Sequence, residues 1–244
     1  MIKRDLIGTN LIINQNKTNA FNLDTVLLAD FIKLNKDVKA IIDYGTGNAG
    51  LLLYLSCLTD AKMIGLEVQP ELCELAQQNI VENGLDKQIT IINVDINDYV
   101  KPGFVDVVVA NPPFFKVNVQ KRLSENPLAK IARHEVLIDL KTLIAKMSKQ
   151  LNNKGVFYMI HRPERLAEIT LYLSENKLAI KRLRLVHSYL NAPANHLLIE
   201  AKKMSKDGMI VEKPLILYDK PHHLSEELKK IYEGEKYVTT KFRP

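Results

Sequence analysis

The sequence predicts an α/β protein built on a mostly parallel sheet with helices on both faces. Between residue 40 and about residue 175, short apolar runs alternate with segments of helical periodicity, a pattern typical of parallel strands joined by right-handed crossovers. The apolar run Val107–Val109 contains no glycine or proline, as expected for a buried strand of a parallel sheet. Two later runs, Ile180–Val186 and Leu197–Ala201, predict an antiparallel pair at one edge of the sheet.

Composition places the chain among ordinary globular proteins, and we expect one domain over residues 1–244. Hydrophobic residues make up 46% of its 244 residues and charged residues 25%. No apolar run reaches the roughly 18 residues of a membrane span, and the N-terminus lacks the features of a signal peptide. We therefore expect a cytoplasmic protein without a metal site, in which Cys57 and Cys73 are free thiols. The net charge of +6 suits a polyanionic partner but does not establish one.

The order of the expected elements follows from these periodicities. Residues 1–20 are expected to form a strand or hairpin with Asn14–Asn16 as the turn, followed by a helix for which Asp24 is the N-cap. Further strands are expected over residues 40–42, 62–68, 89–94, 107–109 and 156–160, and further helices from residue 51 and over 70–83, 136–152, 164–175 and 225–232.

A glycine-rich turn, Asp43-Tyr44-Gly45-Thr46-Gly47, follows the first strand of the alternating region. Glycine permits positive φ and a close approach of a ligand to the backbone. Together with Gly50 the turn fits the G-x-G-x-x-G pattern of dinucleotide sites, and a purely structural turn is a further alternative. The sequence D-x-G-x-G also resembles motif I of S-adenosylmethionine (SAM) binders. The Asp43 carboxylate favours SAM, because it would repel a pyrophosphate and attract an ammonium group.

Two further acids end predicted strands. Glu67 lies about 20 residues beyond the glycine turn, where an acid typically accepts hydrogen bonds from ribose hydroxyls, although it could instead cap the next helix. Asp95 ends the strand over residues 89–94. In the fold that the turn resembles, the acid at this position accepts from the adenine amino group and its neighbour, Ile96, packs on the ring. The alternative for Asp95 is an N-cap role.

The stretch Asp106–Phe115 organises the rest of the chain. Prolines 112 and 113 end its apolar run, so Asn111 lies at the carboxyl end of a central strand, where open α/β sheets bind ligands. Asn111 Oδ1 and the Pro112 carbonyl form two neighbouring acceptors, which suit a planar amino group with two N–H hydrogens. Phe114 adds a flat face for a ring to stack on. The alternative is an Asn-Pro-Pro turn without a ligand.

Asn111-Pro112-Pro113-Phe114 resembles the Asn-Pro-Pro-aromatic motif of class I methyltransferases that act on planar amino groups. The segment from Phe21 to Ala29 resembles the Phe-x-x-x-Thr/Ser-Val-Leu-Leu-Ala element of bacterial methyltransferases that modify adenine in the anticodon loop of valine tRNA. The resemblance covers nearly the whole chain. It implies a Rossmann-like class I methyltransferase fold with a seven-stranded sheet, and makes residues 1–35 an extension that covers the cofactor or the substrate.

The same resemblance implies SAM-dependent N6-methylation of adenine 37, beside the anticodon of valine tRNA. It implies catalytic roles for Asn111, Pro112 and Phe114. The implied cofactor-binding residues are Asp43, Gly45, Gly47, Glu67, Asp95, Ile96 and Asn111. The expected substrate contacts come from Phe114 and from four basic residues that could otherwise form a solvated surface, Lys116, Lys121, Arg122 and Arg133.

Three other functions are weighed against this expectation. Glutamine methyltransferases of release factors carry a helical domain before the cofactor motif, whereas 42 residues precede Asp43 here. DNA adenine methylation would need a target-recognition domain, which the sequence does not indicate. A non-catalytic RNA-binding scaffold predicts a damaged glycine loop or a lost asparagine, and both are intact. The sequence indicates neither a membrane partner nor an obligate protein partner.

Overall fold

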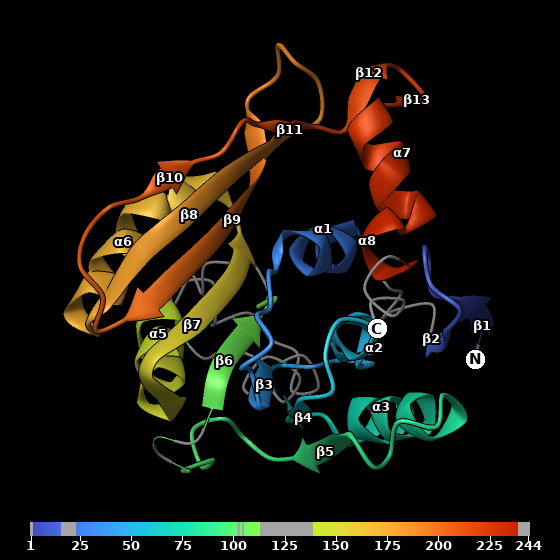
Figure 1. The fold of residues 1–244 in the computed structure, drawn as a ribbon, viewed down its shortest axis with the longest axis vertical. Coiled ribbons are helices and arrows are strands. Elements are labelled where there is room, and N and C mark those ends of the chain that lie inside the picture. Colours follow the sequence, from blue (N-terminus) through green and yellow to red (C-terminus); the bar gives the residue numbers. More distant parts are fainter. Residues whose placement is uncertain (1, 16–22, 102, 104, 113–138, 239–244) are drawn as a thin grey trace, which may run out of the picture.

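A nine-stranded sheet forms the centre of the protein (Figure 1). The computed structural model describes residues 2–15, 23–101, 103, 105–112 and 139–238. The strand order is β10-β8-β9-β7-β6-β3-β4-β5, and β11 also pairs with β8.

Five neighbouring strands of the sheet are parallel, as the alternating pattern predicts. Because all five run the same way, their carboxyl ends meet at one edge, which is where α/β sheets bind ligands. These strands are β3 (Ala40–Tyr44), β4 (Lys62–Glu67), β5 (Ile89–Asn93), β6 (Val105–Ala110) and β7 (Leu151–His161).

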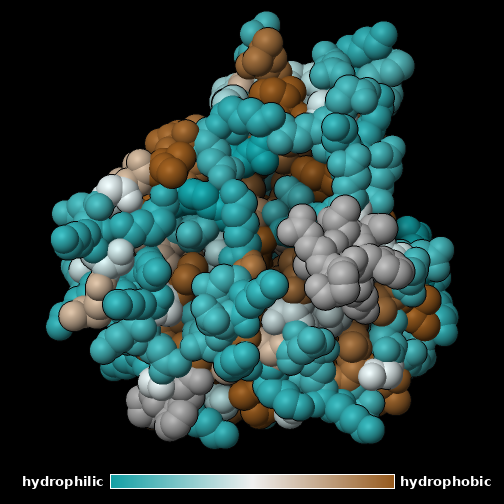
Figure 2. Space-filling model, viewed as in Figure 1, coloured by the Kyte–Doolittle hydropathy of each residue, from teal (hydrophilic) through white to brown (hydrophobic). Residues whose placement is uncertain are grey.

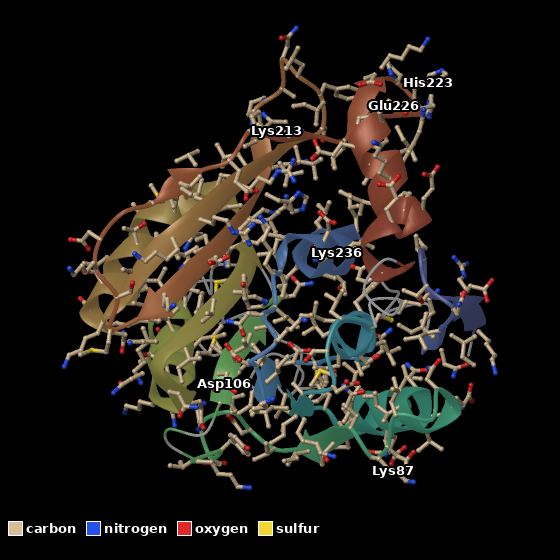
Figure 3. The ribbon with its side chains drawn as sticks, viewed as in Figure 1. Lys87, Asp106, Lys213, His223, Glu226 and Lys236 are labelled. Atoms are coloured by element: carbon tan, nitrogen blue, oxygen red, sulfur yellow. The ribbon has the colours of Figure 1, made fainter. Side chains whose placement is uncertain are left out.

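The carboxylate of Asp106 ties three of these strands together at the opposite, amino edge (Figure 3). Its Oδ2 accepts from the backbone N–H groups of Lys39 and Ala40 at 2.8 and 3.1 Å, at the start of β3. Its Oδ1 accepts from Asn152 Nδ2 on β7 at 3.1 Å. These bonds help to keep the strand ends on the other edge level with one another.

The predicted antiparallel pair is confirmed. β9 (Ala194–Lys203) runs antiparallel to both β7 and β8 (Leu178–His187). The sheet has nine strands rather than the seven that the resemblance implies. The difference is two strands of two residues each, β10 (Ile210–Val211) and β11 (Leu215–Ile216), which pair in parallel with β8.

Helices cover both faces of the sheet and create two hydrophobic clusters. Successive residues of β7 alternate between them, Tyr158 and Ile160 in one and Phe157 and Met159 in the other, because side chains alternate across a strand. Four helices pack on the face that carries Tyr158: α1 (Leu23–Phe31), α2 (Gly50–Ser56), α3 (Pro70–Glu82) and α7 (Glu226–Glu233). The other face is covered by α5 (Leu140–Gln150) and α6 (Leu166–Glu175), and α6 follows the 3-10 turn η2 (Pro163–Arg165).

The N-terminal hairpin differs from its prediction. β1 (Ile2–Asp5) and β2 (Ile12–Gln15) pair antiparallel, so Asn14 and Gln15 lie in a strand and the connection precedes them. The prediction of a turn at Asn14–Gln15 was wrong because Asn14 has a distant partner. Its backbone N–H and its Nδ2 both donate to Asn79 Oδ1 on α3, at 2.7 and 3.0 Å.

Three element boundaries also differ. β7 begins at Leu151, five residues before the predicted start. Its first residues pair with β6 through a register shift between Val105 and Val107, and within them Lys154 has a φ of 67°. The helix expected from residue 136 is described from Leu140 onward. α1 begins at Leu23, which places Asp24 inside its first turn, where Asp24 Oδ1 lies 2.8 Å from His196 Nε2.

The surface is largely hydrophilic on the face that Figure 2 shows. Hydrophobic side chains gather over β10, where Met209, Ile210 and Val211 are 49%, 65% and 60% exposed. Within the described ranges, no helix combines the length and the apolar character that a membrane crossing needs. Two short elements complete the C-terminal part, a hairpin of β12 (Tyr218–Lys220) with β13 (His223–Leu224) and the helix α8 (Glu235–Val238).

Candidate active site

The carboxyl edge of the sheet brings three of the predicted site residues together. Tyr44, which follows Asp43 on β3, pairs with Leu66 beside Glu67 on one side and with Ala110 beside Asn111 on the other. The residues that end β4, β3 and β6 therefore lie at the same level on three adjacent strands. This arrangement places an acid, a glycine loop and an amide around one edge of the sheet.

The glycine loop has the backbone that its sequence predicts. Gly45 and Gly47 have φ values of 76° and 57°, a conformation that side chains with a Cβ rarely adopt. The N–H groups of Gly45 and Thr46 both donate to the Leu66 carbonyl at 2.9 Å. A Cβ added to either glycine would meet no atom within 4 Å, so the space in front of the loop is open.

Glu67 is buried and holds this loop by a hydrogen bond to its backbone. Its Oε2 accepts from the Gly47 N–H and its Oε1 from the Gln69 N–H, both at 2.9 Å. Gln69 is the N-cap of α3, so Glu67 connects the glycine loop with the start of that helix. A carboxylate has about four acceptor sites, and ribose hydroxyls can use the remaining two. The ribose role of Glu67 stays a prediction.

Asp43 is 2% exposed and accepts a 2.8 Å hydrogen bond from Thr46 Oγ1 at its Oδ2. The pKa of Asp43 is raised to about 7, chiefly by burial; the Thr46 hydrogen bond lowers it and the nearby Glu67 carboxylate raises it, and both effects are smaller. No ion pair to Asp43 is found in the part of the chain that the structure describes. A buried carboxyl group of this kind favours the binding of a ligand with a positive group.

A polar link joins the loop to the N-terminal hairpin, and the sequence did not reveal it. Asn79 Nδ2 donates to the Asn48 carbonyl at 2.9 Å and to the Asn14 carbonyl at 3.1 Å. The sequence signal was a polar residue in line with the apolar positions Leu72, Leu75 and Ala76 of α3, which indicated that Asn79 is buried but not which groups it contacts. Asn48 Nδ2, next to the loop, is buried and has no hydrogen-bond partner among the described residues. Such a donor is expected to have an acceptor, which a polar ligand can supply.

Asn111 follows β6, as predicted, and its side chain is half-buried. Its Nδ2 donates to Thr25 Oγ1 on α1 at 3.4 Å, across 86 residues of sequence. Pro112 is also half-buried. The remaining predicted catalytic and substrate-binding residues lie outside the described part of the chain, namely Phe114, Lys116, Lys121, Arg122 and Arg133.

Asp95 follows β5 at the same edge and closes a local turn. Its Oδ1 accepts from the Asn97 N–H at 2.7 Å, and its carbonyl accepts from the Asp98 N–H at 2.9 Å. Its side chain is exposed, and Ile96 packs half-buried against the cluster that contains Tyr99. Asp95 keeps acceptor sites for a ligand, so its expected role toward adenine stays a prediction.

His161 ends β7 at this edge and is 2% exposed. Its Nδ1 accepts from the Arg162 N–H at 2.8 Å. Burial, together with the charge of Arg165, lowers the pKa of His161 to about 4. The imidazole is therefore neutral near pH 7 and adds no positive charge to the site.

These features fit the sulfonium cofactor that motif I implies. Asp43 suits its ammonium group, the open front of the glycine loop leaves space for a ligand, and Glu67 suits vicinal hydroxyls. Asn48 Nδ2 offers one more unused donor beside the loop.

Comparison with known proteins finds relatives among methyltransferases. A family model described as a methyltransferase domain matches residues 35–226. A relative from Porphyromonas gingivalis strain W83, named tRNA1(Val) (adenine(37)-N6)-methyltransferase, is 28% identical over 212 residues, which cover 83% of this chain and 80% of the relative. A relative of the same name from Haemophilus influenzae strain PittEE is 26% identical over 219 residues, covering 88% and 90%.

Solved structures support the fold. A predicted O-methyltransferase from Agrobacterium tumefaciens superposes with a TM-score of 0.68 at 18% identity, covering 87% of this chain and 96% of the other. TYW2 from P. horikoshii, in complex with MeSAdo, gives a TM-score of 0.58 at 13% identity, covering 80% and 69%. These structures confirm the fold, and the family model and the curated relatives confirm the family resemblance that the sequence motifs implied.

Proposed function

Because the chain belongs to the methyltransferase domain family, we propose that it catalyses SAM-dependent N6-methylation of adenine 37 in the anticodon loop of valine tRNA. The reaction and the substrate class come from the names of its curated relatives. The roles of the residues are proposed from the family resemblance, and the position of Asp43, Glu67 and Asn111 at one edge of the sheet supports them.

One observation carries the proposal. The Asn111 amide stands directly after Ala110, which pairs with Tyr44 at the start of the glycine loop. An acceptor for an amino group therefore lies one strand away from Asp43 and two strands away from Glu67. Methyl transfer needs the cofactor and the amine side by side, and the carboxyl edge of an open α/β sheet is where such ligands bind.

In the proposed reaction, Asn111 Oδ1 and the Pro112 carbonyl accept hydrogen bonds from the two N–H groups of the adenine amine. These bonds aim the nitrogen lone pair and offset the positive charge that develops on N6. When bound, the cofactor would supply a methyl group from a positively charged sulfur, which would leave as a neutral thioether, and the methylated amine would release one proton to water. Phe114 is proposed to stack on the base, a contact typically worth about 1–3 kcal/mol. No covalent intermediate with the protein is needed.

The proposed cofactor contacts use the loop residues already described. Asp43 binds the ammonium group, and Gly45 and Gly47 let the backbone approach the cofactor. Glu67 accepts from the ribose hydroxyls, Asp95 accepts from the adenine amino group, and Ile96 packs on that ring. Residues 1–35 are proposed to cover this site, because α1 brings Thr25 to Asn111.

The proposed substrate fits the charge of the chain and the cost of exposing a base. The base must leave its stack to reach Asn111, and this costs less in a single-stranded loop than in a duplex. The net charge of +6 favours a polyanion, and Lys116, Lys121, Arg122 and Arg133 are the proposed phosphate contacts. We place the protein in the cytoplasm with its tRNA. Release-factor methylation and a non-catalytic RNA scaffold are not favoured.

The test is methyl transfer to defined RNA. Purified protein with labelled SAM should place N6-methyladenosine at position 37 of an unmodified valine tRNA transcript, identified by digestion and mass spectrometry. A transcript with guanosine at position 37 is the matched control and should remain unlabelled. Label that enters a release factor and not tRNA would reject the RNA substrate, and equal labelling of other tRNAs would reject the valine specificity.

A further inference from the structure

The contact between Thr25 and Asn111 concerns the orientation of the proposed catalytic amide. Asn111 Nδ2 donates to Thr25 Oγ1 at 3.4 Å. The amide nitrogen therefore points at the Thr25 hydroxyl. The amide oxygen, Oδ1, can accept a hydrogen bond from another partner. An asparagine side chain has nearly the same shape when its oxygen and nitrogen exchange places, so only hydrogen bonds fix which atom faces which way.

This orientation matters for an amine substrate. Oδ1 can accept a hydrogen bond from an N–H group of an amine. If Nδ2 lay in the same place, its N–H groups would face the N–H groups of the amine and no hydrogen bond could form. A turned amide would therefore leave two donors facing each other without an acceptor, which is costly in a partly buried site. Because a hydroxyl can also donate, the contact with Thr25 fixes the position and plane of the amide, and the amine then binds at the oxygen end.

The helix that carries Thr25 is anchored at both ends by groups away from the cofactor loop. In its first turn, Asp24 Oδ1 lies 2.8 Å from Nε2 of His196, which is 7% exposed and lies on β9. At its last turn, Lys236 Nζ donates to the carbonyls of Ala29, Asp30 and Ile32 at 2.6 to 2.7 Å. The position of α1 is therefore set independently of Asn111.

A second cation strengthens the anchor at the C-terminal end of α1. Arg182 Nη2 on β8 donates to the Phe31 carbonyl at 2.7 Å, and its guanidinium lies 4.1 Å from the centre of the Phe31 ring. Arg182 also contacts Glu200 and Glu212 at 2.7 and 2.9 Å. Because the sheet holds Arg182, α1 is fixed to the sheet as a rigid support for Thr25.

We propose that Thr25 is a positioning residue that holds the Asn111 amide in place, with Nδ2 on the Thr25 hydroxyl and Oδ1 available to the methyl-accepting amine. This inference rests on the proposed function for the identity of the amine. The orientation itself belongs to the free protein and can be measured without any substrate.

The experiment compares Thr25→Val, which keeps the shape and removes the hydroxyl, with Thr25→Ser, which keeps the hydroxyl. In the full-length protein labelled with ¹⁵N-asparagine, the Asn111 side-chain amide resonance is identified by its absence from Asn111→Ala. In T25V this resonance should shift and its hydrogens should exchange faster with water, while T25S should resemble the unchanged protein. Thr170→Val, which removes an exposed helix hydroxyl on α6, is the control and should leave the resonance unmoved.

Kinetics on unmodified tRNA provide the second measurement. Loss of one hydrogen bond should lower kcat by roughly five-fold in T25V, with KM for tRNA and cofactor affinity nearly unchanged, and T25S should restore kcat. An unshifted amide resonance in T25V would overturn the inference whatever the substrate is. So would weakened cofactor binding at unchanged kcat, because Thr25 would then act on the cofactor. Failure of the unchanged protein to methylate tRNA would reject the proposed function, while the resonance test would still decide the orientation.

Discussion

The carboxylate of Glu67 and the backbone of Gly47 are joined by a 2.9 Å hydrogen bond between Oε2 and the Gly47 N–H, across 20 residues of sequence. The same carboxylate accepts from the Gln69 N–H at 2.9 Å, so one side chain holds both the loop and the start of α3. An acid is needed here because both of its oxygens accept from backbone N–H groups. An amide at position 67 would place its own N–H group opposite one of these donors.

Glu67→Gln should therefore weaken cofactor binding. The amide can satisfy at most one of the two backbone N–H groups that Glu67 accepts from, those of Gly47 and Gln69. Loss of a hydrogen bond to a charged group costs about 1.5–3 kcal/mol, so the Kd for S-adenosylhomocysteine should rise by roughly ten-fold or more. Titration calorimetry measures the Kd. Glu71→Gln, an exposed change on α3, is the control, and equal affinities in both variants would contradict the role of Glu67.

Cofactor binding should depend on pH through Asp43. Burial raises the pKa of this carboxyl group from 3.8 to about 7 in the free protein, so below pH 7 it is mostly protonated. A bound ammonium group needs the carboxylate, so binding should release a proton. Affinity should fall as the pH drops from 7.5 to 5.5, approaching about ten-fold per pH unit. Calorimetry in buffers of different ionisation enthalpy should detect close to one proton released per ligand at pH 6.

The same pKa shift makes a prediction for stability. Between about pH 4 and pH 7 the folded state binds the Asp43 proton more tightly than the unfolded chain does, so this group's contribution to the free energy of unfolding falls as the pH rises. Asp43→Asn should remove both this slope and the pH dependence of cofactor affinity. An Asn variant that keeps the pH dependence would assign it to another group.

Local patterns predicted the parts of the site that lie at strand ends. Asp43, Glu67 and Asn111 each follow a short apolar run, and parallel strands bring such ends to one edge regardless of side-chain detail. The structure agrees for all three. The glycine loop was predictable for a similar reason, because positive φ at Gly45 and Gly47 leaves a signature in the residue types.

Contacts between distant segments could not be predicted in this way. Asn14 was assigned to a turn because polar residues follow an apolar run, but its partner Asn79 is 65 residues away. The Thr25–Asn111 contact spans 86 residues. No periodicity within a window of ten or fifteen residues carries information about such pairs, because they depend on how whole elements pack.

Gly8 and Gly234 show another such contact. The connection before β2 crosses the end of α7 so closely that a Cβ at Gly234 would lie 1.9 Å from the Gly8 carbonyl oxygen. Gly234 also has a φ of 72°. Gly234→Ala should therefore lower the free energy of unfolding by about 2–5 kcal/mol, from left-handed strain and overlap together.

Guanidinium denaturation measures this loss, and Gly84→Ala is the matched control. Gly84 has a φ of 68° but open space around it, so its variant should cost only the left-handed strain, about 1 kcal/mol. Equal losses in the two variants would show that the Gly8 contact relaxes without cost.

Lys236 provides a stability test at the C-terminal end of α1 (Figure 3). Its Nζ donates to three backbone carbonyls that end this helix, those of Ala29, Asp30 and Ile32. Lys236→Met keeps most of the apolar stem but leaves these carbonyls without their donor, which should lower the free energy of unfolding by about 1–3 kcal/mol. Lys230→Met, an exposed change on α7, should have little effect. Thermal unfolding of the two variants side by side checks this difference.

Asn111 variants test the proposed chemistry most directly. Asn111→Ala removes Oδ1 while leaving Asp43, Glu67 and the glycine loop in place. Loss of one such acceptor should lower kcat by roughly 10²–10³-fold, with cofactor affinity nearly unchanged. Asn111→Asp keeps an acceptor oxygen and loses the donor to Thr25, so its kcat should lie between those of the Ala variant and the unchanged protein. Asn191→Ala, on the exposed connection between β8 and β9, is the control. Steady-state methyl transfer to valine tRNA measures kcat for all four proteins. If kcat in Asn111→Ala equals that of the control, other groups hold the amine, and the proposed role of Asn111 at the carboxyl end of β6 is rejected.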